Sequence, residues 1–431
     1  MIGNDLSGNP RRFVLFTVFY NARAYYPVMA VLFLDLGLTL DQFVLLNLVW
    51  AATIFLFEVP SGALADTVGR RPLLITAAVL MVLEMLCLLF ASCHGGSLLF
   101  GLCILNRILS GLSEACASGA DEALAYDSLD ETGREEAWDG TLAKAMRWRS
   151  VGFVVAMILG GLIYDPSLLN RFFPEGFKLT AAITHRLPVV IVLVQGFICL
   201  GITWRMVEPP PRNPTEIGNS CSRAFHLTVQ TARWVFTHPH TLVIVVFGLS
   251  IDMIVRNLAT INSSYYTLIQ LPAWTFGFIG ATTGLLGWFV PTLAKKLNDR
   301  FSTLTNLGIG AAVTAVGLAA VAQVWPIYGL LPAMLLMTTL GVVSFTVSRA
   351  LHRESDSSKR ATVISVKGLA FNLGYGLFSL GFSRLLAGIP DQPTGMALRH
   401  ALRSQVPVFV ITAVVLYLWS KWLWNRSTPA L

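Results

Sequence analysis

Charged residues are scarce in this sequence. Asp, Glu, Lys and Arg make up 13% of the 431 residues, whereas a soluble domain carries roughly 25%. Hydrophobic residues make up 55%. Because so few charges remain to cover a water-exposed surface, the composition excludes an ordinary soluble domain and indicates a membrane protein.

Sequence motifs for catalysis and metal binding are missing as well. There is no G-x4-G-K-[ST] loop, which argues against an ATP-driven pump. There is no H-E-x-x-H, no G-x-S-x-G and no Cys/His cluster. The paired acids Asp121-Glu122 and Glu135-Glu136 are interpreted as a solvated face rather than an acid/base pair. We therefore expect neither an enzyme nor a metal or cofactor.

Cysteine is infrequent, and its spacing fits neither a disulfide framework nor a metal site. Cys93 and Cys103 flank one loop, so they either pair or remain buried thiols, and we favour the thiols. The six cysteines are Cys87, Cys93, Cys103, Cys116, Cys199 and Cys221.

Long apolar segments, in contrast, recur along the whole chain. A bilayer core about 30 Å thick requires about 20 apolar residues per helix. We expect twelve spans, near 13–36, 42–62, 72–93, 98–125, 143–163, 186–206, 240–264, 273–294, 303–323, 326–348, 362–386 and 404–424. The first segment is longer than the core of a signal peptide and lacks a cleavage pattern, so we expect it to be retained.

A Pro-rich polar stretch beginning at Glu208 follows the sixth span and ends that helix. It predicts three parts: an N-terminal six-helix bundle at 1–206, a linker at 207–239 and a C-terminal six-helix bundle at 240–431. A faint repeat supports two halves, because Val59-Pro60 and Val290-Pro291 precede similar turns.

The basic residues indicate the orientation in the membrane. The net charge is +7, and most of the 31 Lys and Arg residues fall in the even-numbered loops and at the termini. This bias places both termini in the cytoplasm. The bases are scattered singly, so we expect no nucleic-acid partner. Arg70, Arg134, Lys296 and Arg360 are expected to be cytoplasmic, and Lys178 and Arg399 external.

The loop between the second and third spans carries the most specific motif. The run Gly62-Ala-Leu-Ala-Asp66-Thr-Val-Gly69-Arg70-Arg71 fills the pattern G-x-L-a-D-x-x-G-R-R. This loop resembles the signature loop of the major facilitator superfamily of secondary transporters. The alternative interpretation is a turn that is basic only because of its topology.

Two further stretches extend this resemblance. Arg107 and Gly111 match the R-x-x-x-G motif of the family, and the glycines of 152–161 have the spacing of the drug/proton antiporter motif. Ala156-Met157 replaces the Gly-Pro pair of that motif, and Gly-rich helix packing alone would give the same pattern. The segments 118–127 and 360–365 resemble bacterial efflux-type members.

The resemblance implies an all-α membrane fold with two pseudo-symmetric six-helix bundles and transport by alternating access. It also implies a conformational latch, in which Asp66 faces the start of the eleventh helix and Arg70 pairs with Asp127. The latch residues are Gly62, Asp66, Gly69, Arg70, Arg71 and Asp127. We expect a monomer in the bacterial cytoplasmic membrane, in contact with membrane lipid.

Seven charged residues lie well inside the expected spans. Each costs about 2.5–3.5 kcal/mol at a helix centre, so each requires a partner or water. They are Arg23, Glu84, Arg107, Glu114, Asp252, Arg256 and Lys367. Because the cations outnumber the acids, an anionic or zwitterionic solute is favoured. For Glu84 we expect a structural pair or a neutral, proton-bearing state.

From these charges and the nearby amides and aromatics we predict two sets of site residues. The substrate-binding set is Asn21, Arg23, Tyr25, Arg107, Arg256, Asn257, Lys367 and Asn372, with Tyr26 and Tyr375 as further polar groups. Glu114 and Asp252 are the expected proton-coupling acids. Asp252 and Arg256 are spaced i,i+4, so a static ion pair is the alternative.

The sequence therefore predicts a proton-coupled secondary transporter that exports a small organic solute, with that solute and protons as its partners. An uptake permease of the same fold is the second interpretation. A lipid flippase is a rival from another class. A non-transporting sensor would require a sizeable soluble domain, and no loop here is long enough to hold one.

Overall fold

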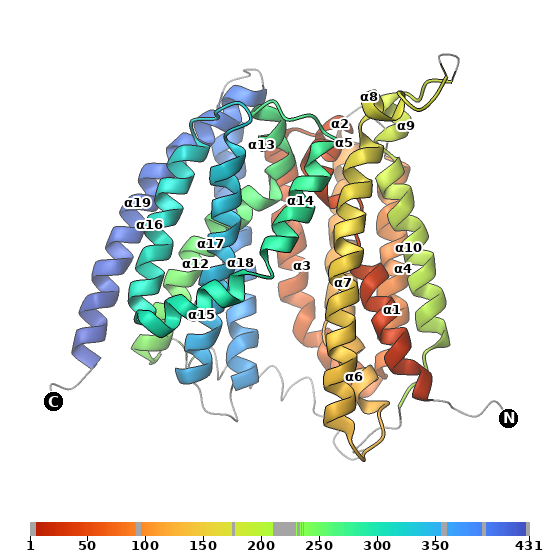
Figure 1. Ribbon diagram of the computed structural model, residues 1–431, viewed down its shortest axis with the longest axis horizontal. Helices are drawn as coiled ribbons and strands as arrows, with labels where there is room; N and C mark the ends of the chain where they lie inside the picture. The colour runs from red at the N-terminus through yellow and green to blue at the C-terminus, as the bar shows by residue number, and fades with distance from the viewer. Residues whose placement is uncertain are drawn as a thin grey trace. The chain divides into compact units, whose positions relative to one another are not determined.

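All regular secondary structure in the described part of the chain is helical (Figure 1). The computed structural model describes residues 6–91, 96–174, 177–209, 237–354, 360–389 and 394–427, together with 230, 233 and 235. The chain divides into two compact units. Unit 1 comprises Met1–Thr39, Val49–Phe225 and Pro272–Ala281, and unit 2 comprises Leu40–Leu48, His226–Leu271 and Thr282–Leu431.

Unit 1 is built from the helices of the first half of the chain. They are α1 (Asn9–Asn21), α2 (Met29–Asp35), α3 (Leu40–Thr67), α4 (Arg70–Leu89), α5 (Ser97–Ala117), α6 (Ala120–Asp127), α7 (Arg134–Tyr164) and α10 (Leu187–Arg205), with the short α8 (Pro166–Leu169) and α9 (Ala181–Thr184). Within the unit, α1 packs between α7 and α10, and α4 packs between α5 and α10.

Unit 2 is built from the helices of the second half. They are α12 (Pro239–Thr260), α13 (Asn262–Leu268), α14 (Thr275–Leu286), α15 (Val290–Arg300), α16 (Thr303–Val321), α17 (Leu330–Glu354), α18 (Arg360–Ala387) and α19 (Thr394–Ser427). Here α12 packs against α16, α17, α18 and α19. The unit boundary crosses two helices, because α3 begins in unit 2 and α14 begins in unit 1.

Nine helices of the described chain are long and apolar enough to cross a bilayer, and a tenth span is formed if α14 and α15 are counted together. The two other expected spans, 13–36 and 362–386, fall on α1 with α2 and on α18. The all-α membrane fold is therefore confirmed, and the arrangement is consistent with twelve spans.

Three expected spans are interrupted. The first breaks between Asn21 and Met29, where Pro27 lies in a short 3-10 turn. The fourth breaks before α6, where Gly119 has a φ of 73°. The eighth bends by 43° between α14 and α15. Proline lacks an N–H group and a left-handed residue cannot continue a helix, so Pro27 and Gly119 account for the first two interruptions.

The glycines of α7 allow close packing inside unit 1. A Cβ atom on Gly152 would lie 2.9 Å from Val18 Cγ1, and one on Gly160 would overlap the carbonyl oxygen of Ala24. Small residues at such positions let helix backbones approach one another. Close helix packing therefore explains the glycine spacing of 152–161, and this spacing is not evidence for export.

The cysteines of the described part are free thiols. Cys103 and Cys199 are buried, and Cys87 and Cys116 are half-buried. Cys93 and Cys221 lie outside the described residues.

Candidate functional site

Arg23 and Glu84 form a buried ion pair in unit 1. Arg23 Nη1 lies 2.5 Å from Glu84 Oε1, and the two side chains are 4% and 0% exposed. Arg23 also donates from Nε to the carbonyl oxygen of Tyr20, 3.0 Å away. Of the two states expected for Glu84, the structure therefore shows the ion pair. Arg23, which was predicted to bind substrate, is the partner in that pair.

Arg107 is buried without an acidic partner in the described chain. Its Nε donates to Asn106 Oδ1 at 3.1 Å, and its guanidinium lies 4.9 Å from the ring centre of Phe33. Its Nη2 is buried and has no hydrogen-bond partner among the described residues. A buried guanidinium with an unsatisfied N–H group is a ready site for an anion.

A pocket of about 190 Å³ lies between α1, α5, α6 and α7 of unit 1. Its walls include Asn21, Glu114, Asp121 and Arg149. The side chain of Glu114 is exposed to this pocket and makes no hydrogen bond within the described part of the chain. A carboxyl group in this position can reach water and exchange protons.

Two of the expected charged residues of unit 2, Asp252 and Arg256, form a connected network with Asn372. Arg256 Nη2 donates to Asp252 at 2.9 Å, and its Nη1 donates to Asn372 Oδ1 at 3.0 Å. The guanidinium also lies 5.5 Å from the ring centre of Tyr375. This network links α12 to α18 inside unit 2. The i,i+4 ion pair anticipated from the spacing of Asp252 and Arg256 is present.

The other predicted substrate-binding residues do not join this network in the described chain. Lys367 Nζ donates to Ser348 Oγ at 3.0 Å. Asn257 is 1% exposed, and its Oδ1 is buried without a partner in the described chain. Tyr25 is buried and packs edge-on against Tyr26.

The signature loop makes the contact expected of Arg70. Arg70 Nη1 donates to Asp127 and, at 2.8 Å, to the carbonyl oxygen of Ala123. The predicted pairing of Arg70 with Asp127 is therefore confirmed, while its role as a latch stays a prediction. The side chain of Asp66 lies outside the described residues, and Gly62 has open space at its Cβ position.

Glu208 completes this loop and was not predicted as a site residue. Its carboxylate accepts the backbone N–H groups of Arg70 at 2.9 Å and Arg71 at 2.6 Å, so it caps the N-terminus of α4. Gly69 has a φ of 108°, and a Cβ atom there would lie 3.0 Å from Glu208 Cδ. The cap therefore explains why glycine is required beside the two arginines. An acid immediately after the sixth span was the only sequence signal.

Asn9 is a second polar residue that no sequence motif singles out. It is fully buried, and its Nδ2 donates to Ser128 Oγ at 2.8 Å and to the carbonyl oxygen of Val207 at 2.7 Å. Its Oδ1 accepts the N–H group of Val207 at 3.1 Å. Asn9 therefore ties the start of α1 to the ends of α6 and α10.

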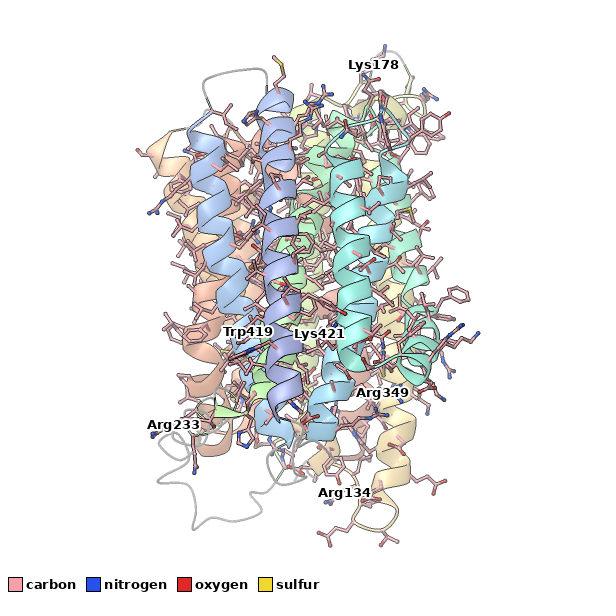
Figure 2. The ribbon with its side chains drawn as sticks, turned by 90° about the vertical axis from the view of Figure 1, so that its left-hand side faces the viewer. Arg134, Lys178, Arg233, Arg349, Trp419 and Lys421 are labelled. Carbon is pink, nitrogen blue, oxygen red and sulfur yellow. The ribbon has the colours of Figure 1, made fainter. Side chains whose placement is uncertain are left out.

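The charged ends of unit 1 agree with a membrane-spanning arrangement. Arg134 and Lys178, which were expected on opposite sides of the membrane, lie at opposite ends of this unit (Figure 2). Apolar spanning helices with buried, partly unpaired charges are typical of membrane transport proteins.

Comparison with known families agrees with this class. A model described as the Major Facilitator Superfamily matches residues 13–379. The chain belongs to this superfamily. No curated protein sequence matches the chain significantly.

Solved structures share the fold. A bacterial homologue of the human lysosomal transporter Spinster superposes with a TM-score of 0.70 at 16% identity, over 99% of this chain and 98% of that one. The nucleoside transporter NupG gives a TM-score of 0.71 at 12% identity, over 98% and 99%. A D-xylose–proton symporter gives 0.64 at 13% identity, over 97% and 96%. The family and these neighbours indicate a transporter rather than an enzyme.

Proposed function

We propose that this protein is a secondary transporter that binds a small organic anion or zwitterion at Arg107. The observation that carries the proposal is the buried Nη2 of Arg107, which lacks a hydrogen-bond partner in the described chain. An unsatisfied buried polar group costs about 1–3 kcal/mol, and more when it is charged. A carboxylate or phosphate group on a solute would remove that cost, because both accept hydrogen bonds from a guanidinium.

Coupling to protons is proposed to occur at Asp252. Its carboxylate holds Arg256, which also contacts Asn372. A proton added to Asp252 removes one charge of the ion pair and leaves the guanidinium free to bind an anion. Departure of that anion favours the ion pair again and releases the proton. Glu114 is the second proposed proton site, since its carboxyl group faces a pocket and lacks a hydrogen-bond partner in the described chain.

Export is the direction that we propose, on the basis of the efflux-type resemblance at 118–127 and 360–365. One structural neighbour is named a D-xylose–proton symporter. That name supports proton coupling and makes uptake the second candidate. Alternating access, cytoplasmic termini and a monomer in the bacterial cytoplasmic membrane belong to the same proposal.

The binding step is tested with purified protein in detergent. A thermal-shift screen across carboxylates, organic phosphates, sugars and organic cations should give stabilisation by anionic or zwitterionic solutes. Arg107→Ala should abolish that stabilisation, whereas Arg147→Ala, at an exposed arginine of α7, should preserve it. Anion-dependent stabilisation that survives in Arg107→Ala would contradict the assignment.

The coupling step is tested in proteoliposomes with the solute found in the screen. Asp252→Asn should lose accumulation driven by a pH gradient and keep downhill exchange. Asp130→Asn, at an exposed loop acid, is the control. If Asp252→Asn and Glu114→Gln both keep full pH-driven accumulation, the two acids are structural. Vesicles of opposite orientation distinguish export from uptake.

A further inference from the structure

An apolar groove runs along the surface of unit 2. It has a volume of about 520 Å³ and lies mainly between α16 and α19. The residues of α19 that line it are Val410, Ala413, Val414, Tyr417 and Leu418. Figure 2 views the molecule from the side on which these two helices lie.

Small side chains on α16 create this groove. Gly308, Ala312 and Ala315 recur at helical spacing along its wall. A Cβ atom on Gly308 would lie 2.8 Å from Tyr417 Cε2, so the tyrosine ring rests against the glycine. This contact fixes the register of the two helices and leaves an open channel beside it.

The groove opens toward the bilayer. Val414 and Leu418 in its wall are 53% and 61% exposed. Both lie on α19, within Gly395–Leu423, a segment long and apolar enough to span a membrane. In a bilayer such a surface is covered by hydrocarbon, so an acyl chain is the occupant that fits its chemistry.

One end of the groove carries a positive charge. The lining residues of α19 fall at positions 410, 413, 414, 417 and 418. Continuing this spacing by one turn gives Lys421, which is exposed. Trp422 beside it is 51% exposed, and Trp419 lies in the same turn (Figure 2). Tryptophan gathers at the level of lipid headgroups.

The facing helix supplies polar groups at the same end. Gly308 contacts Tyr417, and Arg403 near the start of α19 donates to the carbonyl oxygen of Ala322 at the end of α16, so the two helices are antiparallel. The turn of α16 that precedes Gly308 therefore lies toward Lys421. That turn contributes Thr305 to the groove wall, and Ser302 begins the helix one turn earlier. An apolar channel therefore ends at an ammonium group and hydroxyl groups.

We propose that this groove is a binding site for an anionic phospholipid. One acyl chain lies between α16 and α19, and the phosphate of the headgroup contacts Lys421. The site lies on the surface of unit 2 and does not depend on the proposed transport function. A cation near the membrane surface favours anionic lipid, so we expect about a fivefold preference over a zwitterionic lipid.

The headgroup contact is tested by native mass spectrometry of the purified full-length protein. Phosphatidylglycerol and phosphatidylcholine with the same acyl chains are titrated separately. The native protein should prefer phosphatidylglycerol, and Lys421→Gln should remove the preference. Arg399→Gln, at an exposed cation of the same helix, should keep it. Equal binding of the two lipids by the native protein would overturn the proposal.

The acyl-chain contact is tested by filling the groove. Ala312→Phe should lower retention of both lipids, whereas Ile411→Phe, at a 64% exposed position outside the groove wall, should not. Size-exclusion profiles and thermal unfolding establish that each variant is folded, and Ala315→Leu replaces Ala312→Phe if the larger side chain disrupts the helix pair. Unchanged lipid retention in the folded, filled variant would mean that only bulk lipid covers the groove.

Discussion

Arg349 Nη2 donates a hydrogen bond of 2.7 Å to Asp299 Oδ1 and thereby links α17 to α15. Arg70 and Asp127 make the corresponding contact in unit 1. In unit 1 the base, Arg70, lies between the second and third spans. In unit 2 the acid, Asp299, lies at the corresponding place, between the eighth and ninth spans. Both units therefore use an ion pair at equivalent turns, with the two charges exchanged.

Exchanging the charges of Asp299 and Arg349 should test whether the ion pair of unit 2 holds the facing ends of α15 and α17 through attraction alone or needs this order of charges. Asp299→Arg and Arg349→Asp alone place like charges together, and we expect faster hydrogen–deuterium exchange at the facing ends of α15 and α17. The double variant restores the attraction and should return exchange to the native rate. Thermal unfolding should change little, because exposed ion pairs contribute little stability.

The matched control for this experiment is Arg384→Asp, which changes an exposed cation on α18. It should leave exchange in α15 unchanged. If the double variant exchanges as fast as the single ones, the pair does not hold these helix ends.

Arg70→Ala should loosen the turn of unit 1 while leaving expression intact. It removes the contacts to Asp127 and to the carbonyl oxygen of Ala123. We expect a shift toward the inward-open state and slower transport, measured by thiol labelling of single-cysteine variants and by solute flux. Unchanged labelling and unchanged flux would show that the contact is not a latch.

Removal of the carboxylate cap should destabilise the start of α4. Glu208→Ala leaves the N–H groups of Arg70 and Arg71 without their acceptor, and loss of a helix cap costs about 1 kcal/mol. Lower thermal stability and faster exchange in the first turn of α4 are the expected results. Glu131→Ala, at an exposed loop acid, should show neither, and equal behaviour of the two variants would argue against capping.

The sequence was sufficient to predict the helices because their length directly reflects the thickness of the bilayer. The breaks at Pro27 and Gly119 were missed, since spanning helices often tolerate proline and glycine and only local packing decides whether they continue. The pairing of Arg70 with Asp127 was accessible through the resemblance to a known family.

Other contacts required the three-dimensional arrangement. Arg23 and Glu84 are 61 positions apart, and no local pattern indicates which helices face each other. Glu208 was interpreted as part of a linker because a Pro-rich stretch follows it. Its role depends on the proximity of the end of α10 to the start of α4, which packing alone establishes.

The ion pair of Arg23 and Glu84 should respond asymmetrically to substitution. Glu84→Gln leaves a buried guanidinium uncompensated, and breaking a buried pair costs roughly 3–5 kcal/mol. Arg23→Met combined with Glu84→Met removes both charges and should recover most of the thermal stability. A folded double variant that still shows solute-dependent stabilisation would place Arg23 outside the binding site, whereas a stable Glu84→Gln variant would contradict the structural role of the pair.

The surroundings of Arg107 allow a last prediction about anion binding. Asn106 Oδ1 accepts a hydrogen bond from Arg107 Nε, and Asn106 Nδ2 donates to the carbonyl oxygen of Glu84 at 2.7 Å. Asn106→Asp would place a carboxylate beside the guanidinium and neutralise it. We expect anion affinity to fall about tenfold, because a hydrogen bond to a charged group contributes about 1.5–3 kcal/mol.

Asn106→Ala separates this electrostatic effect from a structural one. It loses both hydrogen bonds but adds no charge, so it should lose stability while keeping most of the anion affinity. Binding is followed by isothermal titration with the solute found in the screen. A neutral solute of similar size should bind both variants alike. If Asn106→Asp and Asn106→Ala weaken anion binding equally, Asn106 acts only by holding the helix, and the charge of Arg107 does not determine which solute binds.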